Sequence, residues 1–184
     1  YKRQNLNGWK CIWDNGGTDT ISAAFSLQSV NIDLRNATLQ NQVGGGGYVS
    51  QVGSESKGYT IAYNSTGNCI IENAIGSNFN DVLKGNSYTN VLIAGDGIDK
   101  LFGNAGSDSL HGGNGNDILN GGDGNDTLNG GLGNDSLVGG AGIDSAIFSS
   151  KANRINLGST SRQNTGDGRD ILTGIENVNG GAGN

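Results

Sequence analysis

Apolar and polar positions recur with a period of nine residues between residues 76 and 147. The eighth residue of each nonapeptide is apolar, and it is leucine in seven consecutive units: Leu83, Leu92, Leu101, Leu110, Leu119, Leu128 and Leu137. The sixth residue is Asp or Asn in all eight units: Asp81, Asn90, Asp99, Asp108, Asp117, Asp126, Asp135 and Asp144. A disordered linker has no reason to keep two chemically different positions in phase, so the period predicts a repeat architecture.

The repeat predicts turns and strands, because nine residues is not a helical period and helix interiors disfavour so many glycines. We expect each unit to form a six-residue turn and then a three-residue strand, with the leucine pointing inward. Glycines supply the positive-φ conformations that such turns need. Two units then make one coil of 18 residues, and stacked coils align the leucines in a thin core.

The segments on either side of the repeats have a different pattern. Strand-like runs, VNIDL (30–34) and YTIAY (59–63), indicate a β-rich cap module over residues 1–75. After the repeats, GIDSAIFSS (142–150) echoes GTDTISAAFS (17–26), and GIENVNGGAGN (174–184) echoes IIENAIGSNFN (70–80). We therefore divide the chain into the cap module, the repeat block at 76–147, and a flank at 148–184 that leads into a second repeat array.

Composition argues against an ordinary layered core, since 35 of 184 residues are glycine and only 33% are hydrophobic. The net charge of −6 is concentrated in residues 76–145, where nine Asp and two Lys give −7. No basic stripe is available to neutralise phosphates, which disfavours nucleic-acid binding. No apolar run reaches the ~18 residues of a membrane span.

Stacked coils would place the sixth residues in two columns, one from Asp81 to Asp135 and the other from Asn90 to Asp144. Carboxylates about 5 Å apart in such columns repel one another, and a divalent cation between the coils resolves this. Ca²⁺ accepts six to eight oxygens, including backbone carbonyls, in a flexible geometry, whereas Mg²⁺ demands tighter octahedral geometry. Zn²⁺ prefers His or Cys, and the array has only His111. The pattern therefore favours several Ca²⁺ ions.

The units resemble the calcium-binding nonapeptide GGxGxDxUx of RTX proteins. This resemblance implies an all-β, right-handed parallel β-roll, in which each ion takes carbonyls and Asp from two successive coils. Carried over to this sequence, ions lie between Asp81 and Asp99, Asp99 and Asp117, Asp117 and Asp135, Asp108 and Asp126, and Asp126 and Asp144. The implied carbonyl ligands are Gly95, Gly97, Gly103, Gly106, Gly112, Gly113, Gly115, Gly121, Gly122, Gly124, Gly130, Gly131, Gly133, Gly139, Gly140 and Gly142. The unit GNSYTN departs from the pattern, because it has Asn90 in place of Asp and lacks the internal glycine.

Two further segments, CIWDNGGTDTIS (11–22) and CIIENAIGSNFND (69–81), resemble the mouth of the calcium roll in serralysin-type secreted metalloproteases. The resemblance implies one more calcium site, formed by Asp14, the Gly16 carbonyl, Asp19, the Ile70 carbonyl and Glu72. The upstream Arg/Asp/Thr ligand segment of that family is not recognisable in YKRQNLNGWK. When the motifs of the C-terminal flank are aligned with these two segments, Asp170 and Glu176 are the counterparts of Asp19 and Glu72.

The two cysteines, Cys11 and Cys69, each precede an implied ligand of this site by three residues. If the two segments run side by side into the ion, the thiols are neighbours, and we predict a disulfide, which an extracellular setting permits. Two buried free thiols are the alternative.

No catalytic set is present, because the chain lacks HExxH and its one histidine, His111, falls at an expected exposed strand position. Any catalysis would belong to an upstream domain. We expect a non-catalytic, calcium-triggered folding module of a secreted protein. The resemblance implies export through a type I secretion apparatus, with covalently linked upstream and downstream domains and an extracellular location. A serralysin-like metalloprotease is the favoured parent, and a calcium-dependent spacer of a surface adhesin or S-layer-like protein is the alternative.

Overall fold

The computed structural model describes residues 2–6, 9–13, 18–35, 50–52, 55–61, 70–148 and 155–180, and for 2–13 and 50–61 it describes the backbone alone. Every regular element in these ranges is a β-strand, so no helix there could span a membrane. The strands are β1 (Lys2–Leu6), β2 (Trp9–Trp13), β3 (Thr20–Ser22), β4 (Val30–Asp33), β5 (Ser50–Val52), β6 (Glu55–Ile61), β7 (Asn73–Ile75), β8 (Val82–Lys84), β9 (Val91–Asp96), β10 (Lys100–Ala105), β11 (Ser109–Asn114), β12 (Ile118–Asp123), β13 (Thr127–Leu132), β14 (Ser136–Ala141), β15 (Ser145–Ile147), β16 (Gln163–Asn164), β17 (Arg169–Thr173) and β18 (Asn177–Asn179).

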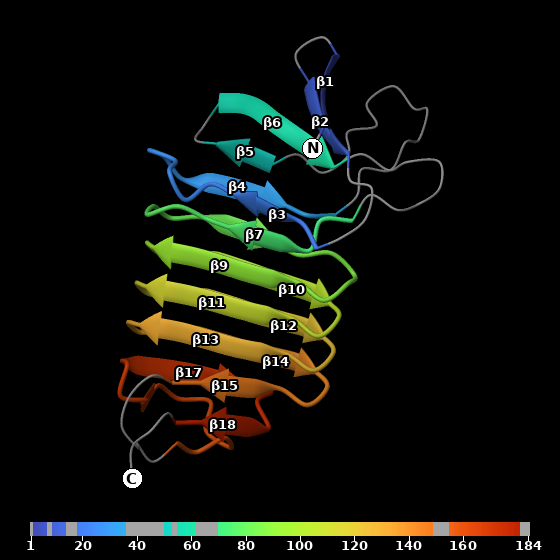
Figure 1. Ribbon diagram of the computed structural model, residues 1–184. Coiled ribbons are helices and arrows are strands. Elements are labelled where there is room, and N and C mark those ends of the chain that lie inside the picture. Colours follow the sequence, from blue (N-terminus) through green and yellow to red (C-terminus); the bar gives the residue numbers. More distant parts are fainter. Residues whose placement is uncertain are drawn as a thin grey trace.

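The strands form two sheets, and through the repeats the chain alternates between them (Figure 1). One sheet has the order β1-β2-β6-β5-β4-β8-β10-β12-β14-β17-β16, and the other has the order β18-β15-β13-β11-β9-β7-β3. Neighbouring repeat strands are parallel and 18 residues apart, as in the pairing of Leu101 with Leu119 and of Leu110 with Leu128. The predicted all-β class and the parallel β-roll of stacked coils are confirmed.

The core of the roll is the predicted row of leucines. All seven, from Leu83 to Leu137, have an exposed fraction of 0%. Ala146 and Leu172 continue the row at the C-terminal end, and Ala74 does so at the N-terminal end. Each coil thus adds two leucines to a narrow core that only the adjacent coils can cover.

The strands are longer than predicted, because β9 to β14 each contain six residues instead of three. The first three residues of the next unit continue the strand, and they pair from coil to coil, as Gly113 does with Gly131. The turn is therefore reduced to the fourth to sixth residues, such as 115–117. A run of Gly-Gly has no apolar alternation, so its strand pairing leaves no mark in the hydrophobic pattern.

Strands from both flanks extend the two sheets. At the N-terminal end, β3 pairs with β7 and β4 pairs with β8, both in parallel. At the C-terminal end, β17 pairs with β14 and β18 pairs with β15, also in parallel (Figure 1). Residues 18–35 and 155–180 therefore continue the stack of repeats at its two ends.

Candidate functional site

The sixth residue of each unit directly precedes a strand, so the pairing of strands stacks these residues in two columns. The first column contains Asp81, Asp99, Asp117, Asp135 and Asp170. The second column contains Asp19, Glu72, Asn90, Asp108, Asp126, Asp144 and Glu176. The stacking predicted for the eight repeat units is found, and residues of both flanks join it.

One oxygen of each inner Asp is held by the backbone of the preceding coil. In the first column, Asp117 Oδ1 accepts the backbone N–H of Asp99 at 2.9 Å, and Asp135 Oδ1 accepts that of Asp117 at 2.9 Å. In the second column, Asp126 Oδ1 accepts the N–H of Asp108 at 2.8 Å. These bonds fix the orientation of every carboxylate, and they leave the second oxygen pointing away from that N–H.

The second oxygen of six inner Asp residues is buried without a hydrogen-bond partner. These atoms are Oδ2 of Asp99, Asp108, Asp117, Asp126, Asp135 and Asp144, whose residues are at most 3% exposed. Burying such an oxygen unpaired costs about 1–3 kcal/mol, and more when it is charged. Six unpaired carboxylate oxygens in two regular columns fit a set of cations, because a cation removes both the desolvation penalty and the mutual repulsion.

The same burial shifts the acidity of the columns. Burial raises the pKa of Asp99, Asp108 and Asp135 to about 7, and the pKa of Asp117 to about 6. Carboxylates of neighbouring coils raise the pKa of Asp99 further, whereas its hydrogen bond from Asp81 N–H lowers it. Without a cation, the fold therefore disfavours ionisation of these carboxylates relative to free Asp side chains.

Glycine at the first position, which seven of the eight units have, leaves room for the unpaired oxygens. A Cβ on Gly103, Gly112 or Gly121 would collide both with Oδ2 of the Asp in its own unit and with the carbonyl oxygen of the first glycine one coil later. Both oxygens lie within 2.7 Å of the place where that Cβ would stand. Carboxylate and carbonyl oxygens thus converge beside the first glycine, the combination that Ca²⁺ prefers.

Glycines at the second and fourth positions have another role, since their φ angles are positive. Gly113 has φ of 114° and Gly115 has φ of 145°, and the same holds for the corresponding glycines from Gly95 to Gly142. The implied carbonyl ligands at these two positions therefore lie in a backbone conformation that residues with a side chain rarely adopt. Asn104 is the one described non-glycine residue with positive φ, and it takes the second position of its unit.

The first two turns are closed by hydrogen bonds of the protein itself. Asp81 Oδ1 accepts the N–H of Val30 at 2.6 Å, and its Oδ2 accepts the N–H of Ser77 at 2.6 Å and the hydroxyl of Ser77 at 2.9 Å. Asn90 Oδ1 accepts the N–H of Asn86 at 2.8 Å, while its amide donates to the Glu72 carbonyl at 2.8 Å. Both side chains are thus satisfied without a cation, unlike the six inner Asp residues.

The structure describes only part of the implied site at the mouth of the roll. Asp14, Gly16 and Cys69 lie outside the described residues, as does the side chain of Cys11, so this site and the disulfide stay predictions. The structure does bring Asp19 and Glu72 together, because the Asp19 N–H donates to Glu72 Oε2 at 2.8 Å. Ile70, two residues before Glu72, is half-buried.

The proposed counterparts in the C-terminal flank are partly wrong. Glu176 does take the place of Glu72, because its Oε2 accepts the N–H of Asp144 at 2.8 Å. Asp144, however, is the residue at the place of Asp19, since the N–H of each donates to Oε2 of the Glu at the next level, Glu176 and Glu72 respectively. Asp170 lies in the other column, within β17 of the 11-stranded sheet, so it is not the counterpart of Asp19.

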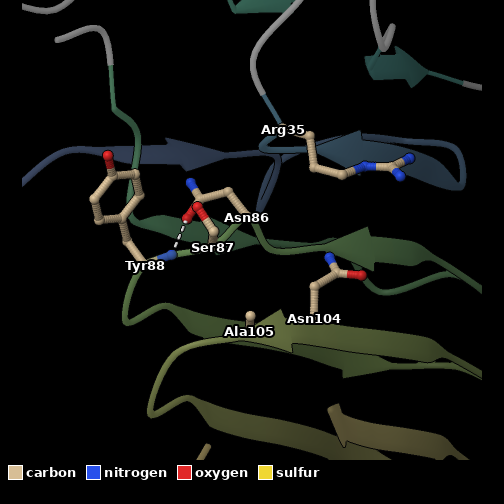
Figure 2. A pocket seen from close by; sticks show the side chains of 6 residues that line it. All are labelled: Arg35, Asn86, Ser87, Tyr88, Asn104 and Ala105. Carbon is tan, nitrogen blue, oxygen red and sulfur yellow. Dashed lines mark hydrogen bonds between the residues drawn. The ribbon is translucent and has the colours of Figure 1, made fainter. Parts of the chain in front are cut away.

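A pocket of about 310 Å³ beside the second turn was not predicted from the sequence (Figure 2). Its lining comes from three levels of the roll: Arg35, Asn86, Ser87, Tyr88, Asn104 and Ala105. Three of its polar side chains are engaged: Asn86 donates to the Ile71 carbonyl at 2.9 Å, Asn104 donates to the Gly85 carbonyl at 2.8 Å, and Arg35 forms an ion pair with Asp33 at 2.6 Å. It is separate from the unpaired Asp oxygens.

Other metal-binding side chains do not gather in the described ranges, which contain no group of three or more His, Cys, Asp or Glu able to hold an ion. His111 is half-buried rather than exposed, and its Nε2 lies 3.0 Å from Ser109 Oγ. Burial lowers the pKa of His111. Any ion in the columns therefore relies on one or two carboxylates together with carbonyls.

Comparison with known families finds a match over the repeats. The model of the RTX calcium-binding nonapeptide repeat, which spans four copies, matches residues 75–110, 84–119 and 111–146. No curated protein matches the chain.

Proposed function

We propose, from the finding that residues 75–146 are RTX calcium-binding repeats folded as a parallel β-roll, that this part of the chain is a calcium-dependent folding module of a secreted protein. The observation that supports the proposal best is the set of six buried carboxylate oxygens without a partner. Bound calcium supplies positive charge between coils and accepts several oxygens at once. A structural, non-catalytic role agrees with a roll whose recurring Asp and Leu residues serve its own stacking.

The ions are assigned to neighbouring Asp residues that both have an unpaired oxygen. In the first column these are Asp99 with Asp117 and Asp117 with Asp135, and in the second column Asp108 with Asp126 and Asp126 with Asp144. Carbonyls of the first glycines complete these sites, and they border Oδ2 of Asp108, Asp117 and Asp126. An ion between Asp81 and Asp99 requires Asp81 to exchange its hydrogen bonds from Ser77 for the cation.

Calcium controls folding because the repeats alone have too little core. Residues 76–145 carry a net charge of −7 and bury about one leucine per nine residues, which does not offset the conformational entropy of the chain. Extracellular calcium modules commonly have Kd values of about 10⁻⁴–10⁻³ M. The module is therefore unfolded at cytosolic calcium levels and folds outside the cell, which assists export through a type I secretion apparatus.

The parent protein has two candidate classes. The sequence motifs around Asp14 and Glu72 favour a serralysin-like metalloprotease, whose catalytic domain would lie upstream. A rigid spacer in a surface adhesin or S-layer-like protein is favoured by the continuous stack, because strands of both flanks extend the roll (Figure 1). The upstream sequence distinguishes them: HExxH indicates the protease, and tandem β-sandwich domains indicate the adhesin.

A calcium titration tests the proposed function. The chain is freed of calcium with EGTA and titrated with calcium while far-UV circular dichroism is recorded, and a parallel titration with magnesium serves as the control. We expect a cooperative gain of strand signal with calcium alone, since stacked coils fold through interactions with their neighbours. A strand signal that is equal before and after calcium addition would contradict the proposal.

A further inference from the structure

The C-terminal flank contains a unit that stacks on the last coil as a repeat unit does, but it does not follow 18 residues after the unit it stacks on. Residues 167–173 read DGRDILT, which corresponds to the third to ninth positions of a nonapeptide, yet they lie beyond the matched residues 75–146. Leu172 pairs with Leu137, and the Asp135 N–H donates to Asp170 Oδ1 at 2.7 Å. This step spans 35 residues, where the repeats use 18.

The second column continues into the flank in the same way, over a step of 32 residues. Glu176 takes the place of the repeat Asp, because the Asp144 N–H donates to Glu176 Oε2 at 2.8 Å. Gly174 takes the place of the first glycine of a unit. A Cβ on Gly139 would collide with the Gly174 carbonyl and with Asp144 Oδ2. One coil earlier, a Cβ on Gly121 would collide in the same way with the Gly139 carbonyl and with Asp126 Oδ2.

Asp144 Oδ2 has no partner in the last repeat unit. The residue is 0% exposed and this oxygen accepts no hydrogen bond. Its environment matches that of Asp126 Oδ2, which is assigned to an ion with Asp144. In the first column the counterpart of Asp144 is Asp135, whose Oδ2 is also unpaired, but Oδ2 of Asp170, the counterpart of Glu176, already accepts the Thr165 hydroxyl.

We propose that the flank completes a terminal calcium site of the second column, formed by Asp144 Oδ2, the Gly174 carbonyl and the Glu176 carboxylate. The inference rests on the proposed function, because it assigns calcium to residues outside the repeats. It differs from a second site at the mouth of another array, since one ligand comes from the last repeat and two come from the flank. The flank therefore serves as the last ligand-bearing coil of this roll.

The test compares the calcium stoichiometry of the wild type with that of Glu176→Gln, by native mass spectrometry and equilibrium dialysis. Glutamine can still accept the Asp144 N–H but lacks the charge, so we expect the loss of one ion per chain. Glu176→Asp places the usual repeat residue at this position and should keep the wild-type number. Asp123→Asn, which removes an exposed carboxylate from the end of β12, is the matched control and should also keep it.

Hydrogen exchange gives a second measurement that is local to the site. In saturating calcium, Glu176→Gln should lose protection at residues 174–178 and retain it in β11 to β13, which also shows that the variant is folded. An unchanged ion number in Glu176→Gln would overturn the inference while leaving the proposed function intact. A wild type that binds no calcium would instead overturn the proposed function itself.

Discussion

Asp117→Asn is predicted to change the stability of the roll in opposite directions with and without calcium. The amide keeps the shape of the side chain, and its oxygen can still accept the Asp99 N–H, which lies 2.9 Å from Asp117 Oδ1. The substitution removes the charge from Oδ2, which is buried without a partner. The new amide N–H₂ can donate to the Gly130 carbonyl, which borders the same space.

The magnitudes follow from the pKa and from the number of ions that Asp117 serves. Burial raises the pKa of Asp117 from 3.8 to about 6, so ionising it in the calcium-free fold costs about 2–3 kcal/mol at neutral pH. The amide removes this cost. With calcium about 100-fold above Kd, each ion stabilises the fold by about 2.7 kcal/mol. Losing two ions outweighs the gain, and the variant becomes less stable than the wild type by about 2–3 kcal/mol.

Two denaturation series measure the effect. Urea unfolding in saturating calcium should show a lower midpoint for Asp117→Asn than for the wild type. Folding induced by trimethylamine N-oxide in calcium-free buffer should show a lower osmolyte midpoint for the variant, because osmolytes strengthen burial without supplying a cation. Asp123→Asn makes the same charge change at an exposed site and should shift neither midpoint appreciably. A shift of the same sign in both series would refute the assignment of Asp117 as a ligand of two ions.

Three more predictions concern acidity, the core and the second turn. In calcium-free buffer, the strand signal in circular dichroism should increase as the pH falls from about 7 towards 4. The reason is that burial raises the pKa of Asp99, Asp108 and Asp135 in the folded state to about 7, so their protonated forms favour the fold. A strand signal that is flat over this range would contradict the prediction. Leu119→Ala, at a fully buried position, should cost about 3–5 kcal/mol in urea unfolding with calcium present, and a cost below about 1 kcal/mol would show that the coils collapse around the cavity. Asn90→Ala should lower the free energy of unfolding by about 1–3 kcal/mol, because it removes the hydrogen bonds to Asn86 and Glu72. The number of bound calcium ions, measured by equilibrium dialysis, should stay the same. The loss of an ion would identify Asn90 as a ligand.

The period of nine predicted the coils, the leucine core and the stacking of the Asp columns, because each depends only on which residues share a phase. Strand length was not predictable in this way. The first three residues of a unit pair through their backbones, and glycine has no side chain to record which face it presents.

The closed turns at Asp81 and Asn90 were also missed, although Asn90 itself was recognised as a departure. Ser77 and Asn86 act through backbone N–H groups whose direction depends on the turn conformation, which a repeat alignment does not contain. The matching of Asp170 with Asp19 was wrong, although the alignment of GIDSAIFSS with GTDTISAAFS pairs Asp144 with Asp19. The sequence offers two candidates for the counterpart of Asp19, Asp144 and Asp170, and the strand pairing decides between them, because β15 joins the sheet of β3 and β17 joins the other sheet.

The long step between Asp135 and Asp170 has a mechanical consequence for a chain pulled by its ends. Peeling one regular coil of 18 residues releases about 60 Å of contour at ~3.4 Å per residue. Peeling the coil that ends at Asp170 releases 35 residues, or about 120 Å. In single-molecule force measurements, the C-terminal end of the roll therefore has a signature of its own, one extension step about twice the length of the others.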